Sequence, residues 1–299
     1  MTLREGLTRR MMLGTTMGAG LAAAGCSPEP EPQPRATTST SLPAPAPSTS
    51  SSPPASPSAI PSPVGPDPAN VAERFAGVTT EQWGMDLPGI VSRLEEPLTA
   101  DGRARIALTF DACGGRSGSG YDAELIEGLI AAQVPATLFV NQRWIEANPA
   151  TMDALIAEPL FELGNHGTRH VPLSVTGREA YGIAGSASAQ EAVDEVWTCH
   201  ERLSALTGTP PRFFRSGTAH YDDVGVAIAT ALGEIPVGFS INGDAGATYP
   251  ASTVRSEVAA SGPGSIVIAH FNRPDGDTAE GMLAAVGELL DAGAVFVHL

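Results

Sequence analysis

Two histidines four positions apart, His166 and His170, occur in the stretch NHGTRH. If this stretch forms a helical turn, both imidazoles face the same side, with Cβ atoms about 5–6 Å apart. That arrangement suits two ligands of one Zn²⁺ or a similar ion. We therefore predict that His166 and His170 bind a metal, with a purely structural role for the pair as the alternative.

Asp111 ends the apolar run RIALTFD, and His270 ends the run GSIVIAH. A carboxylate and an imidazole on opposite sides of one groove can act as a base and an acid. One takes a proton from water and the other gives a proton to a leaving group. We predict these catalytic roles for the two residues. The alternatives are a loop cap at Asp111, helped by the amides of CGG, and a structural hydrogen bond at His270.

Arg215 follows the aromatic pair in PRFFRSG, and Asp244 lies in INGDAGAT. We predict that these two residues form an ion pair that orients Asp111 and sets its pKa. They would then belong to the catalytic set, whereas a plain structural salt bridge is the alternative.

Strands and helices alternate from Arg103 onward and must position these side chains. Runs rich in β-branched and aromatic residues predict seven strands, and runs with apolar residues at helical spacing predict the helices between them. The predicted strands cover residues 105–112, 134–141, 160–167, 211–217, 235–243, 264–271 and 294–299. The predicted helices cover residues 121–133, 147–158, 189–208, 221–233, 251–261 and 277–293.

Strands joined by helices pair in parallel, with right-handed crossovers. The pattern alone leaves an open α/β sheet and a barrel as alternatives. In both, the site lies at the carboxyl ends of the strands. Five of the seven predicted strands end in or beside a chemically capable side chain, which agrees with that placement: Asp111, His166, Arg215, Asp244 and His270.

The composition limits the partners. The 299 residues are 42% hydrophobic, which is enough for a hydrophobic core. All 17 basic residues are arginine, and the formal net charge is -16. Nucleic acids and anionic lipids need clustered basic side chains, so a broad anionic surface argues against both. We expect no nucleic-acid partner, and we expect a monomer.

The N-terminal residues 1–26 are typical of an export signal. The pair Arg9-Arg10 precedes a mild apolar run that is too short for a spanning helix, and the pattern resembles a twin-arginine signal. The run ends in AAGC, which resembles a lipoprotein lipobox, so we predict that Cys26 is lipidated. An ordinary cleavage site is the alternative. The protein would lie at the outer face of the cytoplasmic membrane or in the cell wall, held by the lipid alone, or would otherwise be secreted.

Three further expectations concern the rest of the chain. Residues 27–68 are dominated by Pro, Ser, Thr and Ala and cannot bury enough apolar area to fold, so they predict a disordered tether. Residues 69–102 are expected to pack on the barrel wall. Cys113 and Cys199 remain once Cys26 is set aside, and in an oxidising compartment they are candidates for a disulfide. A nucleophilic thiol at Cys113 is disfavoured because the sequence shows no clear activating base.

These motifs, in this order, resemble those of the polysaccharide deacetylases of carbohydrate esterase family four, the nodulation-protein-B homology domain. The resemblance covers residues 103–299 and implies a distorted parallel (β/α)7 barrel. TFDA resembles the family motif TFDD and gives Asp111 the role of the base. The other motifs are matched in chain order by His166 and His170 as the metal pair, Arg215, Asp244, and finally Ile268 with His270 as the acid.

The resemblance implies a divalent metal, with zinc as the expected ion, but Ala112 replaces the aspartate that supplies the third ligand in the family. Gly167 in HGTRH and the stretch RSGT also depart from the family pattern. A carboxylate would then have to come from elsewhere, and the candidates are Asp111, Asp122, Asp222 and Asp223.

The function implied is an extracytoplasmic, metal-dependent hydrolase that removes acetyl groups from a carbohydrate polymer or cell-wall glycan. It would cleave non-peptide carbon–nitrogen bonds or acetyl esters. Two alternatives stay open. One is a catalytically impaired pseudo-enzyme that binds glycan in the groove, for which the missing carboxylate is the main reason. The other is a metal-independent carbon–nitrogen hydrolase with the same fold.

Overall fold

Apolar runs rich in β-branched residues form the central sheet, as the sequence predicts. Strand β2 coincides with the run RIALTFDA, and all but its first residue are buried. The computed structural model describes residues 65–299, which lie within one compact unit. The predicted export signal, the lipidation site Cys26 and nearly all of the predicted tether lie outside the described residues.

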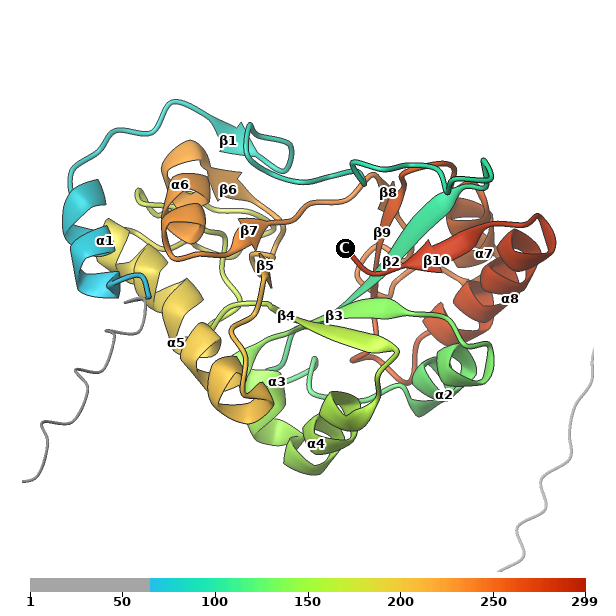
Figure 1. The fold of residues 1–299 in the computed structure, drawn as a ribbon. Coiled ribbons are helices and arrows are strands. Elements are labelled where there is room, and N and C mark those ends of the chain that lie inside the picture. Colours follow the sequence, from blue (N-terminus) through green and yellow to red (C-terminus); the bar gives the residue numbers. More distant parts are fainter. Residues whose placement is uncertain (1–64) are drawn as a thin grey trace, which may run out of the picture. The chain divides into compact units, whose positions relative to one another are not determined.

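The curled sheet is parallel throughout, with the order β7-β5-β4-β3-β2-β9-β8, and β10 pairs with the first residues of β2. Its strands are β2 (Arg105–Ala112), β3 (Ala136–Val140), β4 (Phe161–Asn165), β5 (Phe213–Phe214), β7 (Ile235–Pro236), β8 (Ile241–Asn242), β9 (Ile266–His270) and β10 (Val295–Val297). The predicted fifth strand is therefore split, since residues 237–240 separate β7 from β8. Because these two neighbours in sequence occupy opposite ends of the sheet, the sheet curls into the predicted distorted barrel (Figure 1).

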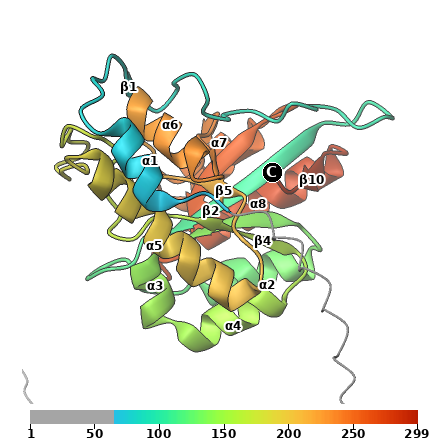
Figure 2. The same ribbon diagram turned by 60° about the vertical axis from the view of Figure 1, so that its left-hand side comes forward.

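Helices cover the outside of this sheet (Figures 1 and 2). They are α1 (Pro68–Phe75), α2 (Ala123–Ala131), α3 (Gln142–Ala147), α4 (Pro149–Ala157), α5 (Ala189–Thr207), α6 (Asp223–Ala231), α7 (Ala251–Ala259) and α8 (Thr278–Asp291). The longest, α5, begins after Ser188, whose hydroxyl accepts from the Glu191 amide, and ends at Gly208 in the left-handed conformation with φ 75°. No helix among residues 65–299 is long and apolar enough to cross a bilayer.

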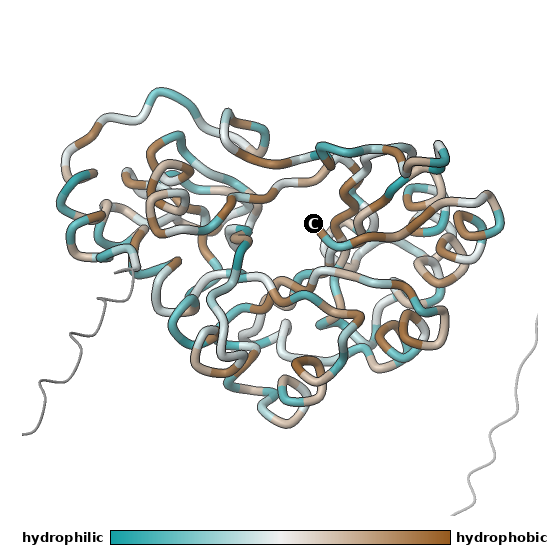
Figure 3. The backbone as a smooth tube through the Cα atoms, in the orientation of Figure 1, coloured by the Kyte–Doolittle hydropathy of each residue, from teal (hydrophilic) through white to brown (hydrophobic). Residues whose placement is uncertain are grey.

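Successive side chains of β2 point to opposite faces of the sheet. Phe110 and Ala112 belong to the hydrophobic core between the sheet and the outer helices. Asp111 lies between them in sequence, yet it lines a cavity on the inner side. Figure 3 shows the hydrophobic residues running along the central strands. Strand alternation thus separates a packed outer face from a chemically active inner face.

The segment before β2 lies against the barrel. Helix α1 contacts α5 and α6, and the short strand β1 (Trp83–Gly84) pairs antiparallel with β6 (Tyr221–Asp222). Further on, the Val91 amide donates to the Pro236 carbonyl, and the Leu94 amide donates to the Gly264 carbonyl. Residues 91–94 therefore bond to the β7 end and the β9 side of the sheet and close the barrel between them.

Candidate active site

Asp111 and His270 end two adjacent strands. β2 and β9 are paired in parallel, and Asp111 lies directly opposite His270 in their register. Both side chains line a cavity of about 420 Å³ at the carboxyl ends of the strands, together with Cys113 and His170. The structure therefore brings the predicted base and acid together, as neighbours rather than on opposite sides of the barrel.

The Asp111 carboxylate is held by Arg215. Arg215 Nη1 donates to Asp111 Oδ1 at 2.8 Å, and both side chains are almost completely buried. Burial alone would raise the pKa of Asp111, but the charges of Arg215, His166 and His270 outweigh it and lower that pKa. Arg215 is itself fixed by the Gly238 carbonyl at 2.9 Å and by the Phe139 ring, 4.3 Å from the guanidinium. Asp111 is thus an ionised carboxylate with one oxygen, Oδ2, free of the arginine.

The predicted Arg215–Asp244 ion pair is wrong. Asp244 bonds to His270 instead, whose Nδ1 lies 2.9 Å from Asp244 Oδ1. Its other oxygen, Oδ2, accepts from the His270 amide at 2.7 Å and from the Thr278 hydroxyl at 3.1 Å. Burial alone would lower the pKa of His270, but the Asp244 carboxylate reverses this and holds that pKa well above its usual value. His270 is thus held as an imidazolium, the form that can donate a proton.

His166 and His170 lie close together, but they do not lie on a helical turn as the sequence analysis assumed. They belong to the loop after β4, and His170 takes the left-handed conformation with φ 63°. The ring centroids are 4.9 Å apart. His166 Nδ1 lies 2.9 Å from the Arg215 carbonyl, so Nδ1 is the donor to that carbonyl and Nε2 is the ring nitrogen that faces Cys113 and Asp111.

A buried carboxylate that the sequence analysis missed holds this loop. Glu195 on α5 is fully buried and accepts the backbone amides of Arg169, His170 and Val171. Three amides converging on one carboxylate stabilise a loop whose backbone is strained at His170. The signal for it in the sequence is weak: a glutamate on the inner face of a predicted amphipathic helix needs polar partners.

Two glycines that depart from the family pattern make room around the same loop. A Cβ at Gly167, where φ is 78°, would stand 2.5 Å from Glu195 Oε1. A Cβ at Gly217 would stand 2.3 Å from the His170 carbonyl carbon. Both departures are therefore required by the way this chain packs its histidine loop.

The side chains around the histidines offer three donor atoms to a metal ion. Sγ of Cys113 and one ring nitrogen each of His166 and His170 lie within 4.8 Å of one another. In tetrahedral zinc sites, bond lengths of about 2.0–2.3 Å place neighbouring nitrogen and sulfur ligands about 3.5 Å apart. The observed distance from Cys113 Sγ to His166 Nε2 is 3.9 Å, so the three donors fit one ion after a small inward movement.

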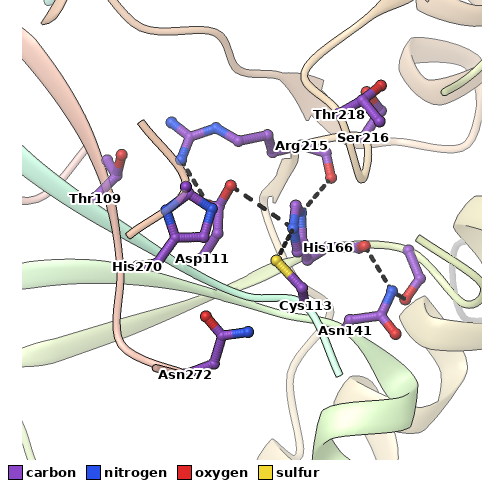
Figure 4. A network of polar contacts seen from close by, with 12 residues as sticks. Thr109, Asp111, Cys113, Asn141, His166, Arg215, Ser216, Thr218, His270 and Asn272 are labelled. Atoms are coloured by element: carbon purple, nitrogen blue, oxygen red, sulfur yellow. Dashed lines mark hydrogen bonds and ion pairs between the residues drawn. The ribbon is translucent and has the colours of Figure 1, made fainter. Parts of the chain in front are cut away.

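The carboxylates considered as replacements for the missing ligand have other partners. Asp122 caps α2, Asp222 caps α6, and Asp223 accepts the Glu81 amide at 3.0 Å. Asp111 remains near, with Oδ2 3.6 Å from His166 Nε2, although its Oδ1 is bound to Arg215. Cys113, which the sequence analysis did not consider as a ligand, is the residue that completes the cluster with His166 and His170. Figure 4 shows its sulfur directed to the ring of His166.

The predicted Cys113–Cys199 disulfide is absent, and both cysteines are free thiols. Cys113 points to the histidines, whereas Cys199 is buried in the core beneath β3 and lies 3.5 Å from the Val140 carbonyl. Burial raises the pKa of Cys199 well above its usual value. Burial also acts to raise the pKa of Cys113, but His170, His166 and His270 outweigh it and hold that pKa well below its usual value.

A second buried histidine–carboxylate pair lies behind the histidine loop. His200 Nδ1 is 2.7 Å from Glu234 Oε1, which also accepts from Asn165 Nδ2. Glu234 Oε2 has no hydrogen-bond partner among the described residues. Burial raises the pKa of Glu234 to about 7 against the opposing effects of His200 and Asn165. The Asn165 side chain in turn accepts the Gly167 amide, so this pair supports the loop without reaching the cavity.

The match to a family model places the barrel in a class, the hydrolases that act on acetyl groups of polysaccharides. Residues 99–235 match the family model described as polysaccharide deacetylase. The chain therefore carries a polysaccharide deacetylase domain, which confirms the family that the sequence motifs predicted. No curated protein matches the sequence.

Solved structures of family 4 carbohydrate esterases share the fold. A pseudoenzyme from Bacillus anthracis has 20% identity and a TM-score of 0.57, covering 72% of this chain and 68% of its own. A mutant of that protein with restored enzymatic activity has 21% identity and a TM-score of 0.57, covering 72% and 71%. An esterase from Streptomyces lividans in complex with acetate has 19% identity and a TM-score of 0.53, covering 64% and 91%. At these identities the similarity shows the fold.

Proposed function

We propose that this protein is an active deacetylase that removes acetyl groups from a carbohydrate polymer, with Asp111 as the base and His270 as the acid. One observation carries this proposal. Asp111 and His270 are register neighbours on β2 and β9 that face one cavity, and the pKa of Asp111 is lowered while that of His270 is raised. At neutral pH one is therefore ready to accept a proton and the other to donate one.

The chain's own groups divide the work of hydrolysis. Arg215 occupies Asp111 Oδ1, which leaves Oδ2 to accept the proton of the attacking water. Asp244 fixes the Nδ1 side of His270, which leaves Nε2 to protonate the departing nitrogen or oxygen. A divalent metal held by His166 and His170 would polarise the acetyl carbonyl. An amine leaves only when protonated, so the acid matters most for N-acetyl substrates.

The cavity suits a sugar bearing a small acyl group. Its lining includes Ile268 and Phe239 as well as Tyr181, which is 76% exposed at the rim. Pockets that combine apolar and aromatic walls with a few convergent polar groups are typical of small-ligand sites. One solved protein of this fold is a peptidoglycan N-acetylglucosamine deacetylase, which supports an acetylated cell-wall glycan as the substrate class.

The proposed location rests on residues 1–26 alone. Their twin arginine, mild apolar run and AAGC ending support export and lipidation at Cys26, with the protein at the outer face of the membrane. Cys26→Ala should then release the protein into the medium. Membrane fractions that keep the variant at the level of the unchanged protein would contradict lipid anchoring.

A glycan-binding role without turnover is the second candidate, favoured by Ala112 in place of the family's metal-binding aspartate. A similar fold is described as a pseudoenzyme, which shows that the barrel exists without activity. The two functions differ in turnover, whereas both allow glycan binding.

Acetate release from a panel of N- and O-acetylated glycans, with and without chelator, separates the candidates. We expect release that falls by about 10²–10⁴-fold in Asp111→Asn, since the amide cannot accept the proton. Asp153→Asn is the matched control, because Asp153 is exposed on α4, outside the cavity. Binding of the same glycans without acetate release would support the second candidate, and release that a chelator leaves unchanged would support metal-independent hydrolysis.

A further inference from the structure

Cys113, the residue after Ala112, offers a donor atom in place of the third metal ligand that the family motif has at position 112. Side chains alternate along β2, so Ala112 packs in the outer core with Phe110, facing away from the cavity. Cys113 is two positions beyond Asp111 and lines the same cavity as Asp111. A donor atom at position 113 therefore reaches the histidines, whereas the side chain at position 112 does not.

The geometry around Cys113 is that of a three-ligand metal site. Its Sγ and ring nitrogens of His166 and His170 lie within 4.8 Å of one another. The ring of His166 is oriented by the Arg215 carbonyl, 2.9 Å from Nδ1, so that Nε2 faces Cys113 Sγ at 3.9 Å. Such a bond from the second ring nitrogen is the usual support of a metal-binding histidine.

The cluster is open on one side. Cys113 and His170 line the cavity, while His166 lies behind them with only 1% of its surface exposed. Three protein ligands with an open position toward a cavity are typical of catalytic metal sites, whereas structural zinc sites have four. The free Asp111 Oδ2 lies beside this open position, 3.6 Å from His166 Nε2.

We propose that the Cys113 thiolate is the third protein ligand of a divalent metal, in place of the missing carboxylate at position 112. The metal–sulfur bond forms with the thiolate, and any proton still on the sulfur passes to solvent when the ion binds. A thiolate with two imidazoles favours zinc or cobalt over magnesium or manganese, which prefer oxygen ligands. This inference deepens the proposed function, but metal binding can be measured without any hydrolysis.

Cobalt(II) provides the test, because a thiolate bound to it gives a charge-transfer absorption in the near ultraviolet. The full chain, reduced and freed of metal, is titrated with Co²⁺. We expect one ion per chain and a thiolate band. Cys113→Ser should lose the band and bind Co²⁺ at least about tenfold more weakly. Cys113→Asp should recover affinity without the band.

Two further variants serve as controls. Cys199→Ala removes the other described cysteine, which faces the core, and should keep the band. Ala112→Asp places a carboxylate in the outer core and should not tighten binding. A cobalt complex of the unchanged protein without a thiolate band would overturn the proposal, and so would unchanged affinity in Cys113→Ser or the absence of any cobalt binding.

Acetate release from the same samples keeps this inference distinct from the proposed function. A thiolate band without acetate release on any glycan would support the metal site and contradict the proposed deacetylase activity. Acetate release by a protein that binds no cobalt would support the deacetylase activity and contradict the metal site.

Discussion

The barrel contains two buried histidine–carboxylate pairs that look alike in isolation. His270 lies 2.9 Å from Asp244, and His200 lies 2.7 Å from Glu234. The first pair ends β9 and its His270 lines the cavity, whereas the second joins α5 to the start of β7 and lies outside that cavity. The ring of His200 instead stacks on Trp197, with centroids 4.3 Å apart.

The two carboxylates differ in how completely they are bonded. Asp244 accepts from the His270 ring and amide, from the Gly246 amide and from the Thr278 hydroxyl. Glu234 leaves one oxygen without a partner, and burial raises its pKa to about 7. A fully bonded carboxylate can sustain an imidazolium that does chemistry, whereas a partly bonded one is a cost in stability. The pair alone does not define a site; its bonding and its access to a cavity do.

The largest expected effect comes from removing His270, and removal of His200 provides the comparison. His270→Ala should lower acetate release by about 10²–10⁴-fold, with amide substrates affected more than esters, because the departing amine loses its proton donor. His200→Ala should leave the rate per folded molecule within a few-fold. Steady-state kinetics on both variants, with circular dichroism to count folded protein, make the comparison. Equal losses of rate per folded molecule in the two variants would contradict the different roles assigned to the two pairs.

Neutralising each carboxylate should affect the pH profile differently. Hydrolysis needs protonated His270, so the rate should fall as the pH rises through the raised pKa of that residue. Asp244→Asn removes the charge that raises this pKa, and the alkaline limb should move to lower pH, with a loss of about 10–100-fold at neutral pH. Glu234→Gln should keep the alkaline limb in place. If the alkaline limb of the pH profile stays in place in Asp244→Asn, the titration of His270 does not set that limb.

Stability should respond to the second pair. The pKa of Glu234 is raised from 4.5 to about 7 in the folded protein, so the folded state holds this proton more tightly than the unfolded state. Its contribution is therefore most favourable below about pH 4.5 and is lost as the pH rises to about 7. Glu234→Gln should remove this slope and change the free energy of unfolding at pH 8 by roughly 1–3 kcal/mol. Urea unfolding of both proteins at pH 4.5 and 8 measures it; equal slopes would show that Glu234 does not titrate there.

The smallest effect belongs to the stacking partner. Trp197→Leu removes the ring against His200 and should destabilise the fold by about 0.5–1.5 kcal/mol, with no change in the rate per folded molecule. Thermal unfolding followed by acetate assays measures both quantities. A loss of activity without a loss of stability would connect the second pair to the site after all.

The sequence predicted the parts of the molecule that follow local patterns. β2 coincides with RIALTFDA and α5 with the long amphipathic run, because period and capping are local properties. Placing Asp111, His166 and His270 at strand ends was enough to bring them together, since parallel strands end at one edge of a barrel. The same motif residues, read in chain order, were also sufficient to predict the polysaccharide deacetylase family.

Partner choice could not be predicted in the same way. Arg215 pairs with Asp111 and not with Asp244, because the barrel's curvature and not the sequence order decides which carboxylate its guanidinium meets. The absence of the disulfide has the same origin, since Cys199 faces the core and Cys113 faces the cavity. Glu195 was missed because its partners are backbone amides, which carry no residue-specific signal.

The pairing of β2 with β9 also constrains how the chain folds. The Thr109 hydroxyl donates to the Val267 carbonyl across 158 positions of sequence, and Asp111 and His270 become neighbours through the same pairing. Contacts of such long range slow folding and leave an unpaired, apolar strand edge exposed until they form. The edge of β2 that faces β9 stays unpaired until β9 is in place, whereas β3 pairs with the other edge of β2 and β4 pairs with β3 through shorter-range contacts. Asp111 gains its neighbour His270 only through this pairing, so any fault in the packing of β9 on β2 removes the proton donor while leaving the carboxylate in place.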